Sequence, residues 1–184
     1  MNLKTRLIIA TLSISFQYVI SNCQQRNDQL TLFESIFAND PKYLFTQPQI
    51  SGPERTQIKK AIVDEINRSK QEIVFWFYGF NEPEIIESLV KAKKRGVSLV
   101  LTGSSDQDYT QLQQNGLSYR LRAKSGLQHA KIMIIDRSMI ISGTGNFTKS
   151  GLYYNNNLFF FSTISVTTAN QIIYALEDEA KPSI

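Results

Sequence analysis

The chain has 184 residues, 42% of them hydrophobic and 20% charged, and it shows neither an internal repeat nor a long low-complexity tract. This composition indicates one soluble globular domain and argues against a disordered or fibrous protein. The formal net charge is only +4, and a single cysteine and a single histidine exclude an internal disulfide and a transition-metal site built from a Cys and His cluster.

The N-terminal residues resemble an export signal. Lys4 and Arg6 precede an apolar stretch, residues 7–20, that is short for a membrane span and fits the hydrophobic region of a secretory signal peptide. Cys23 follows in the sequence ISNC, which resembles a bacterial lipobox, where the cysteine becomes the lipidated first residue of the mature protein. A simple signal peptide or an uncleaved anchor is the alternative.

We therefore expect three segments along the chain. Residues 1–22 form the signal peptide, residues 23–40 a tether and residues 41–184 the folded domain. The net charge without residues 1–22 is +2, because they hold two basic and no acidic side chains. An excess of this size gives little support for a nucleic-acid partner. The protein is expected to be exported, as a membrane-anchored lipoprotein or as a periplasmic protein.

Strands and helices alternate through the expected domain. Residues 72–80 (EIVFWFYGF) are apolar on both faces, which predicts a central strand. The other predicted elements, in chain order, are a strand at 41–47, a helix at 52–70, a helix capped by Asn81 and running from Pro83 to Gly96, a strand at 97–102, a short helix ending at Gly116, a helical turn at 147–153, a strand at 158–163 and a helix at 166–178. This order predicts an α/β sandwich around a mixed β-sheet.

Three basic residues alternate along residues 118–124. If this segment is a strand, Arg120, Arg122 and Lys124 share one face and lead toward the only histidine. The three side chains are a candidate track for a polyanion. An exposed edge strand protected by charge is an equally good explanation.

The run from His129 to Asn146 carries the chemistry. It is apolar and β-branched, which predicts a hairpin with strands at 130–135 and 139–142 and a turn at 136–138. The residues from Gly143 to Asn146 (GTGN) then form a tight loop.

Alternation along the first strand places His129 and Lys131 on one side and turns Ala130 and Ile132 into the core. An imidazole beside an ammonium, with the Asn146 amide and a hydroxyl brought back by the loop, makes a coherent phosphate site. A packed histidine at the start of a buried strand, followed by an ordinary turn, is the alternative explanation.

The spacing of His129, Lys131, Asp136, Gly143 and Asn146 resembles the HKD signature of the phospholipase D superfamily. The segment before the hairpin is similar as well, so the resemblance covers roughly residues 41–180. It implies a phospholipase D-like αβα sandwich around a mixed sheet, with one HKD motif per chain.

Two positions depart from the family pattern. Thr144 stands where family members commonly have serine, and it keeps the hydroxyl. Asn157 stands on or near the position where many small members carry a glutamate that supports the histidine.

The resemblance implies that His129 forms a phosphohistidine, with Lys131, Asn146, Thr144 and Gly143 binding the phosphate. Asp136 belongs to the motif, but its strand parity differs from that of His129, so we expect an orienting or structural role. The reaction needs a second acid, and family members supply it from a second motif. A chain with one motif is therefore expected to work as a homodimer whose two His129 residues share the site. The family needs no metal or other cofactor.

The substrate is open between two classes. A membrane-tethered phosphodiesterase can hydrolyse phospholipid headgroups, and we favour this narrowly. Small exported endonucleases of the superfamily suggest DNA or RNA instead, with Arg120, Arg122 and Lys124 along the backbone. A third hypothesis is an inactive module that binds phosphate without turnover, which Asn157 favours slightly.

Overall fold

The computed structural model describes residues 41–122 and 127–178. The strands are β1 (Lys42–Phe45), β2 (Glu72–Trp76), β3 (Ser98–Ser104), β4 (Arg120–Arg122), β5 (Ile132–Ile135), β6 (Met139–Gly143) and β7 (Leu158–Thr163). The helical elements are η1 (Pro53–Thr56), α2 (Gln57–Arg68), α3 (Pro83–Lys94), α4 (Thr110–Gln114), η2 (Ser150–Tyr154) and α5 (Val166–Asp178). Within the described residues the strands form one sheet in the order β1-β7-β6-β5-β2-β3-β4.

The sheet is mixed, as the sequence predicts. β2, β3 and β4 run parallel to one another, whereas β5, β6, β7 and β1 pair antiparallel with their neighbours. β2 lies between β3 and β5, and four of its five residues are buried, so residues on both faces are covered. The prediction of a central strand is therefore confirmed.

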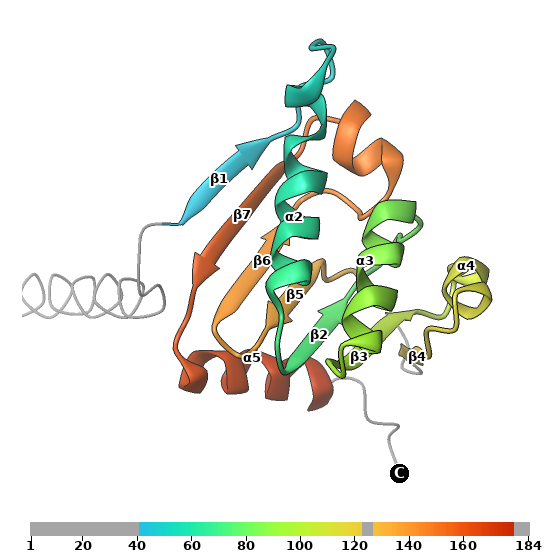
Figure 1. Cartoon of the computed structure of the whole chain (residues 1–184), viewed down its shortest axis with the longest axis vertical. Coiled ribbons are helices and arrows are strands. Elements are labelled where there is room, and N and C mark those ends of the chain that lie inside the picture. The colour runs from blue at the N-terminus through green and yellow to red at the C-terminus, as the bar shows by residue number, and fades with distance from the viewer. Residues whose placement is uncertain (1–40, 123–126, 179–184) are drawn as a thin grey trace, which may run out of the picture. The chain divides into compact units, whose positions relative to one another are not determined.

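The main core lies between the sheet and two helices. Figure 1 shows α2 and α3 lying across one face of the sheet. The side chains that meet there include Ile58, Ile62, Ile66, Ile85, Leu89, Phe75, Phe77 and Phe147. Phe75 contacts Phe77 and Phe147 with ring centroids 4.8 and 4.6 Å apart. Truncating a buried isoleucine of such a core to alanine typically costs about 2–5 kcal/mol of stability.

The helix α5 marks one end of the sheet (Figure 1). Arg137, in the β5–β6 turn, donates a hydrogen bond to Asn170 in the first half of α5. Arg120 of the edge strand β4 forms an ion pair with Glu177 near the end of the helix. We call the end of the sheet that carries the β5–β6 turn the α5 end, because β7 ends and α5 begins beside this turn, where Ile164 N donates to Ser138 O at 2.8 Å.

The structure differs from the sequence prediction in the lengths of two strands, since β2 ends at Trp76 and β5 begins only at Ile132, and in two helical details. The residue that precedes α3 is Glu82 rather than Asn81, and it is extended at φ −74° and ψ 116° without a side-chain cap. A residue before proline is pushed out of the helical region, and Pro83 opens the helix. The predicted helical turn after Asn146 is a π-helical turn, η2, that begins at Ser150.

Among the described residues, no helix has the length and apolarity needed to cross a membrane.

Candidate active site

His129, Lys131 and Asn146 gather at the end of the sheet opposite the β5–β6 turn. Trp76 at the end of β2 pairs with Ile132 at the start of β5, and Ile132 pairs with Ser142 near the end of β6. The segments after β2, before β5 and after β6 therefore meet, which brings His129 and Asn146 together. We call this the motif end of the sheet.

His129 is exposed, and its neighbours fix the backbone that carries it. The Gln128 side chain is only 2% exposed. Its Nε2 donates to the carbonyl oxygens of Phe77 at 3.0 Å and Ala130 at 3.2 Å, and its Oε1 accepts from Ala130 N at 2.7 Å. The imidazole itself lies against Tyr78, with ring centroids 5.0 Å apart. Gln128 thus bonds the segment before β5 to Phe77, directly after β2, and also bonds the backbone on the far side of His129, at Ala130.

Lys131 is the least expected feature of the site. Its residue is 6% exposed, so it is more buried than Ala130 and Ile132, which were expected to face the core. Its Nζ donates to the His129 carbonyl oxygen at 2.8 Å and lies 5.6 Å from the Tyr78 ring centroid. Burial lowers the pKa of the Lys131 ammonium. The side chains of His129 and Lys131 therefore both lie close to the Tyr78 ring, but His129 is exposed and Lys131 is buried.

Asn146 is held against the end of β2. Phe147 N donates to Gly79 O at 3.0 Å, and a Cβ on Gly79 would lie 3.2 Å from Asn146 Nδ2. A Cβ on Gly151 of η2 would lie only 2.2 Å from Asn146 O, so η2 packs backbone against backbone behind the loop. Asn146 Oδ1 is buried and has no hydrogen-bond partner within the described part of the chain.

In the loop after β6, Thr144 is hydrogen-bonded to Asn157, which follows η2. Thr144 Oγ1 donates to Asn157 Oδ1 at 3.0 Å, and Thr144 N donates to Leu158 O at 3.0 Å. Asn157 Nδ2 donates to Gly151 O at 2.9 Å. A Cβ on Gly143 would lie 2.6 Å from Leu158 O, so this position requires glycine. Thr144 and Gly143 therefore build the loop, and the Asn157 side chain bonds within the loop rather than to His129.

Asp136 lies in the β5–β6 turn, away from the other motif residues. Seven residues of extended chain, roughly 20 Å, separate it from His129. Its carboxylate accepts hydrogen bonds from the backbone N–H groups of Lys70, Gln71 and Glu72 at 2.8–3.0 Å. Partial burial raises the pKa of Asp136, but these hydrogen bonds outweigh it, so the pKa lies below its usual value. The structure does not bring Asp136 to the phosphate site, which fits the structural role expected from its strand parity.

The predicted basic track is only partly described. Arg120 Nε donates to Thr102 Oγ1 at 3.0 Å in addition to its ion pair with Glu177. Arg122 donates to Leu127 O at 3.2 Å. Lys124 and Cys23 lie outside the described residues, so a role for Lys124 in polyanion binding and lipidation of Cys23 stay predictions.

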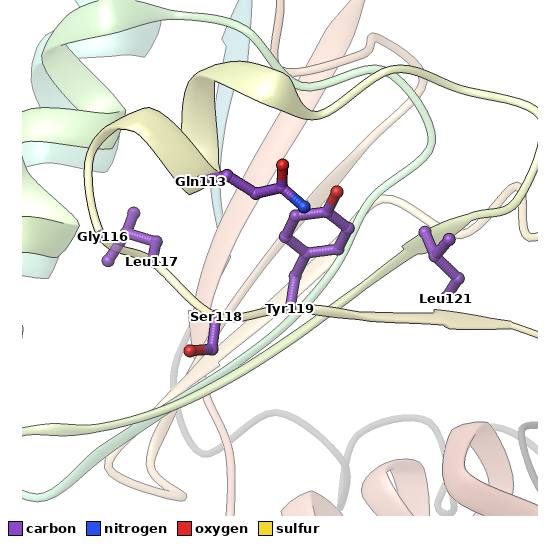
Figure 2. Close-up of a pocket in the computed structure, with 6 residues that line it drawn as sticks. All are labelled: Gln113, Gly116, Leu117, Ser118, Tyr119 and Leu121. Atoms are coloured by element: carbon purple, nitrogen blue, oxygen red, sulfur yellow. The ribbon is translucent and has the colours of Figure 1, made fainter.

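A cavity of about 550 Å³ lies between α4 and β4, apart from the motif. Figure 2 shows the residues that line it, which are Gln113, Gly116, Leu117, Ser118, Tyr119 and Leu121. None of them belongs to the motif. The described residues also contain no group of three or more His, Cys, Asp or Glu side chains that could hold a metal ion.

Comparison with known proteins identifies the family. A family model described as cardiolipin synthase, PLD-like domain, matches residues 62–179, which include the whole motif. The chain belongs to the phospholipase D-like family. This phospholipase D-like chain is 32% identical over 97 residues to phospholipase D of Rickettsia prowazekii, a match that covers 50% of the chain and 47% of the relative. Phospholipase D of Rickettsia felis is 32% identical over 95 residues, covering 48% of each protein. The phospholipase D-like chain thus matches about half the length of these relatives.

Solved structures agree on the fold. Nuc from Salmonella typhimurium, a phospholipase D family member, superposes with a TM-score of 0.63 at 22% identity, covering 76% of this chain and 94% of Nuc. NucT from Helicobacter pylori gives a TM-score of 0.57 at 15% identity, covering 76% of this chain and 96% of NucT. The phospholipase D-like αβ architecture predicted from the sequence is therefore confirmed.

Sequence reasoning missed two residues that shape the site in this phospholipase D-like chain. Gln128 stands directly before His129, but a polar residue there is not distinguishable from a loop residue until its burial is known. Tyr78 was included only as part of the apolar run of the central strand. The feature that could have indicated Tyr78 is its hydroxyl group, because a tyrosine at the end of a buried strand needs a hydrogen-bond partner there.

Proposed function

We propose that this chain is a phosphodiesterase that cleaves its substrate through a phosphohistidine at His129. The observation that carries the proposal is the buried ammonium of Lys131 beside the exposed imidazole. Lys131 takes part in none of the ion pairs found among the described residues, and its hydrogen bond is to a neutral carbonyl. A buried cation without a carboxylate is destabilising unless an anion compensates it, and a substrate phosphate is such an anion.

The proposed reaction has two steps. A ring nitrogen of His129 attacks phosphorus, the bond to the leaving alkoxide breaks, and an acid gives the alkoxide its proton. The same group then takes a proton from water, the hydroxide attacks the phosphohistidine, and the imidazole is released. Lys131 and Asn146 bind the non-bridging oxygens and stabilise the extra charge of the transition state. Because the Thr144 donors are used within the loop, we give Thr144 and Gly143 a supporting part in phosphate binding.

The acid in this scheme is the His129 of a second copy of the chain. One histidine per chain cannot act as nucleophile and as acid in the same step, and the exposed position of His129 leaves it accessible to another protomer. We therefore propose a homodimer with a two-fold axis through the motif end of the sheet.

Phospholipid is the first candidate substrate. The relatives from Rickettsia are named phospholipase D, and the family description names cardiolipin synthase. An exported chain anchored at Cys23 would meet lipid at the membrane surface.

Nucleic acid is the second candidate. Its support from this chain is the basic edge at Arg120 and Arg122, yet Arg120 is paired with Glu177, which reduces the charge available to a backbone phosphate. An inactive phosphate-binding module is the third candidate, and Asn157 in place of the family glutamate is its support.

One experiment separates the three candidates. The full chain and its His129→Ala variant are incubated in chelator with a chromogenic phosphodiester, phospholipid vesicles, and single- and double-stranded nucleic acid. We expect His129→Ala to lower turnover by at least ~10³-fold, because the nucleophile is lost. Full activity of the variant contradicts the mechanism, and binding of phosphate without turnover by the wild type identifies an inactive module. Cleavage of nucleic acid with no release of a lipid headgroup replaces the first substrate by the second.

A further inference from the structure

The Tyr78 ring lies close to the side chains of both His129 and Lys131. The ring lies 5.0 Å from the His129 ring, at an interplanar angle of 57°, and 5.6 Å from Lys131 Nζ. An aromatic face attracts an ammonium by its quadrupole and limits the rotation of an imidazole packed against it. One ring therefore constrains both the proposed nucleophile and the proposed phosphate-binding cation.

A carboxylate holds this ring in place. Tyr78 OH donates a hydrogen bond of 2.9 Å to Asp106 Oδ2, in the loop that follows β3. The bond to Asp106 raises the pKa of Tyr78. Hydrogen bonds to ionised groups are the stronger class, so the pair fixes the tyrosine side chain in one orientation.

The backbone of Tyr78 is fixed by a different residue. Tyr109 OH donates to Tyr78 O and accepts from Ser104 N at 2.9 Å. The Tyr109 ring packs where a side chain at position 103 would be, since a Cβ on Gly103 would lie 2.4 Å from that ring. Changes at Asp106 therefore release the Tyr78 side chain while its main chain stays anchored.

We infer that Tyr78, oriented by Asp106, is a positioning residue that sets the relative placement of the His129 imidazole and the Lys131 ammonium. The inference rests on the proposed function of these two residues. It also answers how the histidine is supported in a chain whose Asn157 is bonded to Thr144 and Gly151. The supporting carboxylate is that of Asp106 in the β3–α4 loop, and it acts on His129 through the Tyr78 ring.

Nuclear magnetic resonance tests the placement without using activity. The chain holds one histidine, so histidine-selective labelling gives one set of imidazole signals per protomer. The Tyr78 ring shifts the imidazole C–H signals by its ring current. We expect Tyr78→Leu to move these signals strongly, and Tyr78→Phe and Asp106→Asn to move them less and broaden them, because the ring remains but is no longer fixed.

Steady-state kinetics on the chromogenic phosphodiester provide the second readout. Asp106→Asn and Tyr78→Phe are each expected to lower kcat about 10-fold with little change in KM, since misplacement of reacting groups by less than 1 Å has effects of this order or larger. The double variant should lose no more than Tyr78→Phe alone, because that change already removes the hydrogen bond that Asp106→Asn weakens.

Asp108→Asn is the matched control. Asp108 lies in the same loop, but its carboxylate accepts from Thr110 N at 2.9 Å and Thr110 Oγ1 at 2.6 Å rather than from Tyr78. Unchanged imidazole signals and unchanged kcat in both Asp106→Asn and Tyr78→Phe overturn the inference, as does an equal loss in Asp108→Asn or additive losses in the double variant. Failure of the proposed function appears separately, as full turnover by His129→Ala.

Discussion

At the scale of single residues, the site combines an exposed histidine with a buried lysine. Alternation along a strand predicts that His129 and Lys131 lie on one side, but it does not predict their exposure. Exposure depends on which side chains surround the strand end, and here Tyr78 and the His129 carbonyl enclose the lysine. The result is a buried cation, and under the proposed function it is placed for a phosphate at the expense of stability.

The variant Lys131→Met tests whether the buried charge lowers the stability of the fold and raises turnover. The variant removes a buried charge and keeps an unbranched apolar chain of similar length. We expect the free energy of unfolding at pH 7 to rise by about 1 kcal/mol. Turnover of a phosphodiester should fall at least ~10²-fold, because the charge that stabilises the transition state is lost. Urea denaturation and initial rates measure the two effects on the same sample.

The stability gain also has a defined pH dependence. The pKa of Lys131 is lowered in the folded chain, so between that value and the usual value of about 10.4 the unfolded chain binds more protons. Wild-type stability therefore rises with pH in this window, and the advantage of the methionine variant shrinks there. Lys149→Met, at an exposed lysine, is the control. A gain that is constant up to pH 11, or equal in the control, contradicts the account.

The motif residues were predictable because their spacing is local. One hairpin and one loop bring His129, Lys131 and Asn146 together, and turn and strand periodicity describe both. The contacts of Tyr78 with Asp106 and of Gln128 with Phe77 were not predictable, since they join segments from different strands. Such contacts depend on register and packing across the sheet, which a single sequence does not encode in its local pattern.

At the scale of elements, the β5–β6 hairpin is attached to the start of β2 through its turn. Asp136 and Arg137 both have left-handed backbone, with φ of 51° and 52°. Asp136 accepts its hydrogen bonds from residues 70–72, and Arg137 pairs with Glu72. The turn thus fixes the connection between α2 and β2.

Strand positions were predicted closely because the apolar runs are clear. The cap of α3 was predicted wrongly, because the restriction that Pro83 places on Glu82 outweighs the capping preference of Asn81.

Asp136→Ala tests whether this motif residue is structural. We expect a loss of about 2 kcal/mol at pH 7, because three backbone N–H groups lose their ionised acceptor. The pKa of Asp136 is lowered in the folded chain, so its contribution is complete above the usual value of about 3.9 and is lost as the pH falls through the lower folded value. The difference between variant and wild type should therefore shrink below pH 4. In the folded protein kcat should change less than about 3-fold, and a large loss of kcat with normal stability would instead assign Asp136 a catalytic part.

At the scale of the whole molecule, each chain carries half of what the proposed reaction needs. The sheet brings a nucleophile, a cation and an amide to one end, but the chain has no second histidine to protonate the leaving group. Asp106 does not replace it, because its carboxylate accepts from Tyr78 OH, and Asp136 lies far from His129 in the β5–β6 turn. The proposed symmetric dimer would supply the missing group with no change in the fold.

Subunit mixing distinguishes a shared site from an independent one. Wild-type chain is incubated with an equal amount of His129→Ala chain long enough for protomers to exchange, and turnover is compared with the same amount of wild type alone. If both histidines are required, random pairing leaves a quarter of the dimers active and turnover falls to about half. Independent sites leave turnover unchanged. Lys60→Ala chain, altered at an exposed residue of α2, controls for dilution and should have no effect. Sedimentation at micromolar concentration completes the test, because a fully active monomer is incompatible with a site that needs two copies of His129.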